Sequence, residues 1–338
     1  MKRVLAVGLV ALAEAAISGV CDAQTVTFAE LTEALQVPQD QLARLENGEI
    51  ISYEIAEKSE EELAMGVATT LSAPVGTVLE GMKKHDLAEI DTKIVAKGNI
   101  PATAGIEAFQ GFAFEDSDEA EDFLKAGPGD RFNLSVEEIG QLKAAREKPG
   151  EPGKQSAIDQ ASRQYREFLL QRYKAYRGSG LAKIGAYARY RGTADPSAEL
   201  RLATSSNRVL AKYFPEFHKA WLNYPAALPQ GTEEKFRWII RQVEDRPTAT
   251  LVHRLWQTLD RGAVIASREY YAGHSYNSSQ FVAGVLPYGD KTAVFYGHDT
   301  FTDQVAGIGA RLKHSIGRGR LRDEMVARLK RLKALIGP

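Results

Sequence analysis

The sequence predicts an α+β fold in which a curved antiparallel sheet packs against a long C-terminal helix, with a helical insertion between the two halves of the sheet. Two observations carry this prediction. Residues 235–299 contain five stretches in which apolar and polar side chains alternate, separated by short turns. After residue 318, apolar residues recur at every third or fourth position up to the C-terminus, which is the spacing of one helical face.

Residues 1–23 have the pattern of a secretory signal peptide. Lys2 and Arg3 precede an apolar core over residues 4–13, and a small-x-small cleavage site follows at residues 21–23. The segment is too short and interrupted to span a bilayer. Cys21, the only cysteine, would be removed with it. We therefore expect a protein exported to the periplasm or the extracellular space, without a disulfide.

Residues 24–147 form the acidic N-terminal part of the predicted domain. The order of predicted elements is a helix over 27–46, strands over 49–56 and 63–71, a helix over 75–87 and a strand over 90–100. Residues 24–150 hold 11 Lys and Arg and 25 Asp and Glu, whereas residues 151–338 hold 30 and 17. Such asymmetry predicts that the halves attract each other within one unit. The acidic cluster 115–122 lacks calcium-loop spacing and reads as a helix start.

A linker and a helical insertion follow. Residues 148–154 contain two Pro-Gly pairs and are typical of a linker. Residues 155–231 are predicted to be the insertion, a lid or cap on the sheet. One amphipathic helix ends at Gly178, and another opens at Pro196 and stops before Pro215. Residues 232–338 then contain the antiparallel strands and the terminal helix.

Two segments resemble a known family. Residues 62–79 (ELAMGVATTLSAPVGTVL) and 92–98 (TKIVAKG) are similar to the opening of START-like, Bet v 1-like (helix-grip) domains. In that family a strand ending in Ala-Pro precedes a helix, and a curved antiparallel sheet wraps a long C-terminal helix around a hydrophobic cavity. The resemblance covers roughly residues 49–100 and 235–336, and the intervening segment is longer than the family places there. It implies a hydrophobic or lipid-like ligand.

The predicted ligand-binding residues are aromatic or basic side chains of the strand region. Such a mixture suits a mainly apolar pocket with a few orienting polar groups, although the aromatic residues also suit a packed core. The residues are Trp238, Trp256, Arg254, Arg268, Tyr270, Tyr276 and Tyr296.

Three histidines lie on different predicted strands of this sheet. If His253, His274 and His298 faced one side, they could converge on a metal ion, completed by Asp299 or Asp303. An error of one residue in strand parity would turn any of them outward. Hydrogen bonds to neighbouring Tyr or Asp side chains are the alternative. The sequence therefore predicts no metal and no other cofactor.

No enzyme motif is complete. Ser278 or Ser279 with His274 and Asp303 would supply the groups of a hydrolase triad, but no Gly-x-Ser-x-Gly elbow surrounds either serine. Residues 307–312 lack the third glycine of a dinucleotide fingerprint, and the phosphate-loop motif is absent.

Three classes of function remain open. The favoured one is non-catalytic binding of a hydrophobic or lipid-like ligand between the sheet and the C-terminal helix. The second is an enzyme that uses the His, Tyr and Arg side chains of the same cavity, with or without a metal. The third is a periplasmic protein-interaction module. A cavity would favour ligand binding, and converging histidines would favour the enzyme. A filled core beside an exposed apolar patch would favour the interaction module.

The terminal helix also carries many cations. Its basic face either is solvated while the apolar face docks on the sheet, or meets anionic lipid at a membrane surface. The cations are Arg320, Arg322, Arg328, Lys330, Arg331 and Lys333. Nucleic acid is not an expected partner of an exported protein with this charge pattern.

Overall fold

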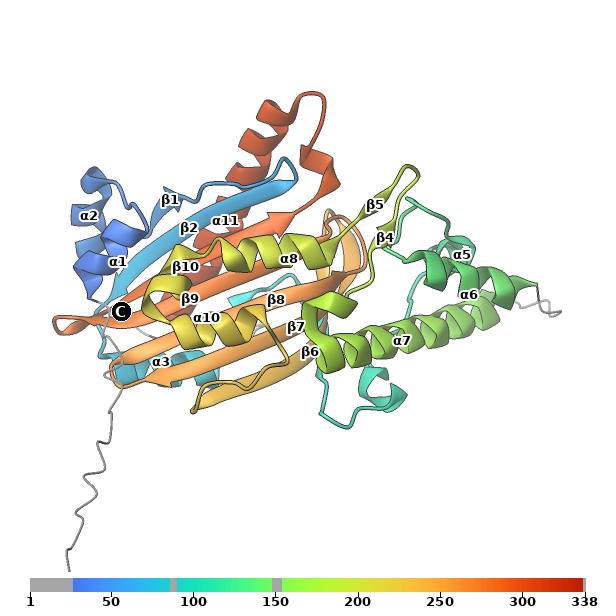
Figure 1. Ribbon diagram of the computed structural model, residues 1–338, viewed down its shortest axis with the longest axis horizontal. Coiled ribbons are helices and arrows are strands. Elements are labelled where there is room, and N and C mark those ends of the chain that lie inside the picture. Colours follow the sequence, from blue (N-terminus) through green and yellow to red (C-terminus); the bar gives the residue numbers. More distant parts are fainter. Residues whose placement is uncertain (1–26, 86–89, 148–153, 337–338) are drawn as a thin grey trace, which may run out of the picture.

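The computed structural model describes residues 27–85, 90–147 and 154–336. The predicted signal peptide and nearly all of the predicted linker lie outside these ranges. An eight-stranded sheet with the order β1-β2-β10-β9-β8-β7-β6-β3 forms the centre of the molecule, and every neighbouring pair is antiparallel (Figure 1). The sheet is curved and does not close on itself, which confirms the predicted α+β class.

The strands agree closely with the alternating stretches. The long strands are β2 (Glu62–Leu71), β6 (Thr232–Val243), β7 (Arg246–Leu259), β8 (Gly262–Ala272), β9 (Ser278–Tyr288) and β10 (Lys291–Phe301). The edge strands are β1 (Ile51–Glu54) and β3 (Ile94–Asn99), and a separate hairpin contains β4 (Tyr187–Ala188) and β5 (Thr193–Ala194).

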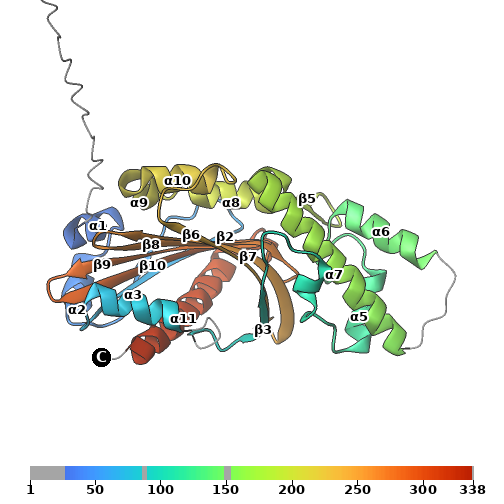
Figure 2. The same ribbon diagram turned by 90° about the horizontal axis from the view of Figure 1, so that it is seen from below.

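Helices cover both faces of the sheet. Figure 2 shows α3 (Val75–Lys84) and α11 (Ala310–Ile336) on the concave side and α8 (Pro196–Ser205), α9 (Arg208–Tyr213) and α10 (Pro215–Leu222) on the convex side. The remaining helices lie at the two ends: α1 (Phe28–Ala34) and α2 (Gln39–Glu46) at one, and α5 (Ser117–Lys125), α6 (Val136–Arg146) and α7 (Lys154–Ser179) at the other. Short 3-10 turns are η1 (Ile106–Phe109), η2 (Gly180–Lys183) and η3 (Asp303–Val305).

Strand alternation decides which side chains face which layer. In β7, Leu251, His253 and Leu255 are buried on the convex face, while Arg254 and Trp256 point to the concave face. A bulge between β7 and β8 interrupts this period. As a result Tyr270 and Tyr271, although adjacent, pack in the same aromatic core with α7.

Three helix boundaries differ from the prediction, one of them at a proline. The predicted helix over 27–46 is two helices, because Pro38 caps the second one. The predicted helix from Pro196 is also two helices, α8 and α9, because Asn207 caps the second one; α9 stops before Pro215 as predicted, and Pro215 occupies the first turn of α10. The terminal helix begins at Ala310, earlier than the apolar pattern indicates.

The terminal helix docks through its predicted apolar face. Met325, Leu329 and Leu332 are buried against residues of β2, including Met65 and Val67. Ion pairs join the acidic N-terminal half to the basic C-terminal half, for instance Glu119–Arg246 and Glu138–Arg172. Within the described residues, no helix is both long and apolar enough for a membrane span.

Truncation of the α11 contact should destabilise the fold. Leu329 is 4% exposed, so Leu329→Ala is expected to lower the unfolding free energy by about 2–5 kcal/mol through lost burial and a residual cavity. Urea unfolding measures the change. Leu312→Ala, in the same helix at 67% exposure, is the control and should have almost no effect. Equal losses for both variants would contradict the docking of α11 through Leu329.

Candidate ligand-binding site

A cavity of about 1380 Å³ lies between the concave face of the sheet and helices α3 and α11. This volume exceeds the roughly 300–1,000 Å³ of most small-molecule pockets, so a lipid-sized ligand would fit. Much of the lining is apolar: Met82 from α3, Leu321, Leu329 and Leu332 from α11, and Trp256, Ile265, Phe281, Ala283 and Val294 from the sheet.

The strand register arranges the floor of this cavity in three rows that run across the sheet. The first row is largely apolar and contains Glu233, Trp256, Ile265, Ala283 and Tyr296. The second contains Lys235, Arg254, Ser267, Phe281 and His298. The third contains Arg237, Val252, Glu269, Ser279 and Thr300. Polarity therefore increases from one end of the floor to the other.

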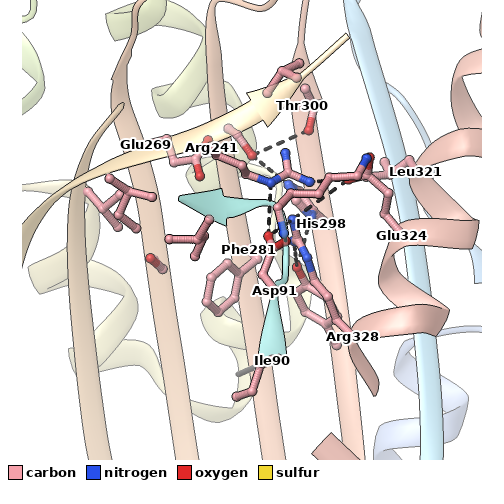
Figure 3. Close-up of a pocket in the computed structure, with 18 of the residues that line it drawn as sticks. Ile90, Asp91, Arg241, Glu269, Phe281, His298, Thr300, Leu321, Glu324 and Arg328 are labelled. Atoms are coloured by element: carbon pink, nitrogen blue, oxygen red, sulfur yellow. Dashed lines mark hydrogen bonds and ion pairs between the residues drawn. The ribbon is translucent and has the colours of Figure 1, made fainter. Parts of the chain in front are cut away.

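An ion-pair network bridges the sheet and α11 at the polar end. Asp91 accepts hydrogen bonds from Arg241 of β6 at 2.9 Å and from Arg328 of α11 at 2.6 Å. Glu324 of α11 pairs with Arg241 and with Lys93. In Figure 3 the labelled side chains of Asp91, Arg241, Glu324 and Arg328 point toward one another. The network thus holds α11 to the sheet beside the cavity.

His298 forms hydrogen bonds with two hydroxyl groups inside the cavity. Its Nε2 lies 2.6 Å from the Ser279 hydroxyl, and its Nδ1 lies 3.0 Å from the Tyr296 hydroxyl. Burial, followed by the charges of Arg328 and Arg241, lowers the pKa of His298 to about 3. The imidazole is therefore neutral and can act as a hydrogen-bond donor and acceptor. A serine beside a neutral imidazole supplies two groups of a hydrolase, but the ring is oriented by a phenol rather than a carboxylate.

The structure brings four of the seven predicted ligand-binding residues to this cavity. Arg254, Trp256, Tyr276 and Tyr296 line it. Whether they contact a ligand stays a prediction.

The other three predicted residues lie on the opposite, convex face, because strand alternation directs them there. Trp238 donates to the Ala108 carbonyl at 2.7 Å. The guanidinium of Arg268 stacks 3.6 Å from the Trp221 ring centre, and Tyr270 stacks on α7. The structure therefore does not bring these three residues together with the other four.

The three histidines do not converge. His253 is buried on the convex face, where Tyr176 and Glu234 bind its two ring nitrogens at 2.8 and 3.0 Å. His274 contacts the Pro247 carbonyl, and only His298 reaches the cavity. Among the residues that the structure describes, no three His, Cys, Asp or Glu side chains are placed to hold a metal ion.

The aspartates considered with the histidines also lie elsewhere. The pKa of Asp299 is raised by burial and by the nearby Glu62, and Asp303 forms an ion pair with Arg189 at 2.6 Å. The Ser-His-Asp set considered from the sequence is therefore not assembled: Ser279 pairs with His298, not with His274.

Sequence reasoning missed the polar half of the site. Alternation had placed Arg237 and Arg241 on one face of β6, which was the available signal. No local pattern indicated that Asp91, just before β3, would meet α11, because the two are distant in sequence.

Comparisons with known proteins add little. No protein-family model and no curated protein matches the chain. One match among solved structures is the crystal structure of Ara h 8.0201, a Bet v 1 family allergen, at 10% identity and a TM-score of 0.18, covering 40% of this chain and 89% of that chain. This is a weak resemblance in fold. At this TM-score it carries no argument about function, which rests on the cavity.

Protonation of Glu324 at acid pH should lower the free energy of unfolding. Desolvation disfavours its charge, but Arg241 and Lys93 outweigh this and lower its pKa to about 2. A depressed pKa stabilises the fold above the unfolded-state pKa, and the gain is lost as pH falls through the folded-state pKa. Glu324→Gln should therefore lower the unfolding free energy at pH 7 by about 2–3 kcal/mol, with allowance for partial exposure.

Urea unfolding across pH checks this expectation. The difference between the wild type and Glu324→Gln should shrink between pH 4.5 and about pH 2. Asp323→Asn is the matched control, since Asp323 is 72% exposed and pairs with the neighbouring Arg322. A difference that stays constant over this pH range would show that Glu324 does not act through its charge.

Proposed function

We propose that this protein binds a hydrophobic or lipid-like ligand, without catalysis, in the cavity between the sheet and α11. The cavity itself is the observation that carries the proposal. The cavity has a volume of about 1380 Å³, and the apolar row of its floor faces apolar side chains of α3 and α11. Burial of apolar ligand surface there is favourable by roughly 25 cal/mol per Å².

The two alternative functions have less support. An enzyme would use Ser279 and His298, which form a hydrogen bond inside the cavity. An interaction module was expected to have a filled core beside an apolar patch, whereas here the concave face is hollow. We therefore retain ligand binding as the proposal and regard the polar end of the floor as the part that orients the ligand.

We further propose that the protein is exported and meets anionic membranes at the start of α11. Ile308 lies in the turn before α11, and Leu312 and Ile316 lie four residues apart in its first turns; the three side chains are 100%, 67% and 51% exposed. The exposed cations Arg311 and Lys313 lie among them. Apolar side chains that insert between lipids and cations that meet anionic head groups form a typical interfacial surface. Because Ile316 also lines the cavity, this surface adjoins the binding site.

Native mass spectrometry of the protein purified from its host tests the ligand proposal. We expect a lipid-sized mass that denaturing extraction releases, on a chain that lacks residues 1–23. Ala283→Trp should fill the apolar row and reduce the bound fraction by about tenfold or more, as an indole cannot share this space with a ligand. Ser205→Trp is the control, because Ser205 is an exposed residue at the end of α8. A bare wild-type mass would argue against a resident ligand.

Vesicle co-sedimentation tests the membrane proposal. A variant with Ile308, Leu312 and Ile316 changed to Ser should bind vesicles containing phosphatidylglycerol about tenfold or more weakly, since each buried Ile or Leu side chain contributes about 1.5–3 kcal/mol. Val136→Ser, at an apolar residue of α6 that is 71% exposed, should not change binding. If the wild type bound neutral and anionic vesicles equally, the role of the cations would be refuted.

A further inference from the structure

Arg254 is a cation in the cavity that lacks a counter-ion. Its guanidinium lies 5.3 Å from the ring centre of Phe281. Among the described residues, no carboxylate, hydroxyl or carbonyl binds it, whereas Arg241, Arg328 and Lys83 of the same cavity all form ion pairs. Arg254 is partly buried and lines the cavity, so the donors of its guanidinium are available to a ligand there.

The neighbours of Arg254 increase the local positive charge. Lys235 lies directly opposite on β6, and like charges at opposed positions of two strands destabilise a sheet. Arg237 occupies the adjacent row, where it donates to the Asn99 amide oxygen at 3.1 Å rather than to a carboxylate. Burial, with the charge of Arg237, lowers the pKa of Arg254 to about 10. The guanidinium nevertheless remains charged near neutral pH.

Ser267 adds a hydrogen-bond donor on the other side of Arg254. It is the β8 partner of Arg254 in the register, lines the cavity and is 2% exposed. Within the part of the chain that the structure describes, its hydroxyl has no hydrogen-bond partner. Because this hydroxyl lines the cavity and is bonded to no protein group, Ser267 is a second group with free bonding capacity at the same place.

We propose that Arg254, assisted by Lys235 and Ser267, binds the anionic head group of an amphiphile whose apolar chain lies over Trp256, Ile265 and Ala283. This inference rests on the proposed function and deepens it: the ligand carries a carboxylate or a phosphate. A guanidinium presents a planar pair of donors that matches either group with two parallel hydrogen bonds. The apolar row is the next row of the floor, two residues along β7 from Arg254.

Titration with matched sixteen-carbon probes tests the inference. Hexadecanoate, hexadecyl phosphate and hexadecanol share one chain and differ in head group, and isothermal calorimetry on the full chain gives each affinity. The wild type should bind at least one of the two anions about tenfold or more tightly than the alcohol. Arg254→Met should reduce the affinity for that anion to that for the alcohol and leave the affinity for the alcohol unchanged.

Further variants separate the head-group contact from general effects. Arg254→Lys keeps the charge but loses the paired donors, so its affinity for the anion should lie between those of the wild type and Arg254→Met. Lys235→Gln and Ser267→Ala should give smaller losses. Arg261→Met is the matched control: Arg261 is exposed in the turn after the same strand and should not affect binding. Removal of an uncompensated charge should leave the unfolding midpoint of Arg254→Met unchanged or raised.

The outcomes are distinguishable. If the wild type binds hexadecanol and both anions equally, the head-group site is refuted while the proposed function stands. If no probe binds, the proposed function and this inference fall together. If Arg254→Met unfolds or has a lowered midpoint, Arg254 serves the fold and the inference is overturned. The more tightly bound anion identifies the head group, and failure of inorganic phosphate alone to compete shows that the apolar chain is required.

Discussion

The position of α11 depends on one physical requirement: the arginines at the polar end of the concave face, Arg241 and Arg328, must find acidic partners. Met325, Leu329 and Leu332 press the helix onto β2, but at the polar end of the floor the guanidinium of Arg241 cannot be buried without acids. Asp91 and Glu324 supply these acids from two different segments. We infer that the network supports α11 at a distance from β7 and β8, which leaves the cavity open rather than collapsed.

Most of the fold could be predicted from local patterns. A period of two residues marked the long strands, and a period near 3.6 marked the buried face of α11, because both periods arise from burial of one face. The charge split also corresponds to contacts, since Glu119 and Glu138 pair with arginines of the C-terminal half. Prolines were harder to interpret: Pro215 reads equally as the end of one helix and the first turn of the next.

The candidate site was less predictable because it depends on contacts between distant segments. Arg254 and Trp256 were identified together, since they share the parity of β7. Arg268 and Tyr270 are likewise an arginine and an aromatic residue two positions apart, but they face the opposite side of the sheet from Arg254 and Trp256. Only the strand register shows which pair faces the cavity. The partner of Arg328 could not be inferred at all, because Asp91 is remote in sequence and follows no motif.

The strand order has a consequence for how the chain reaches this structure. β1 pairs locally with β2, but the other edge of β2 pairs with β10, and β3 pairs with β6, so these two N-terminal strands are joined to the sheet only by the last third of the chain. Such non-local pairing raises the contact order, and closure of long loops must precede the stabilising contacts. During synthesis one edge of β2 and the whole of β3 therefore emerge without partners, and the sheet is completed only after β10 has left the ribosome.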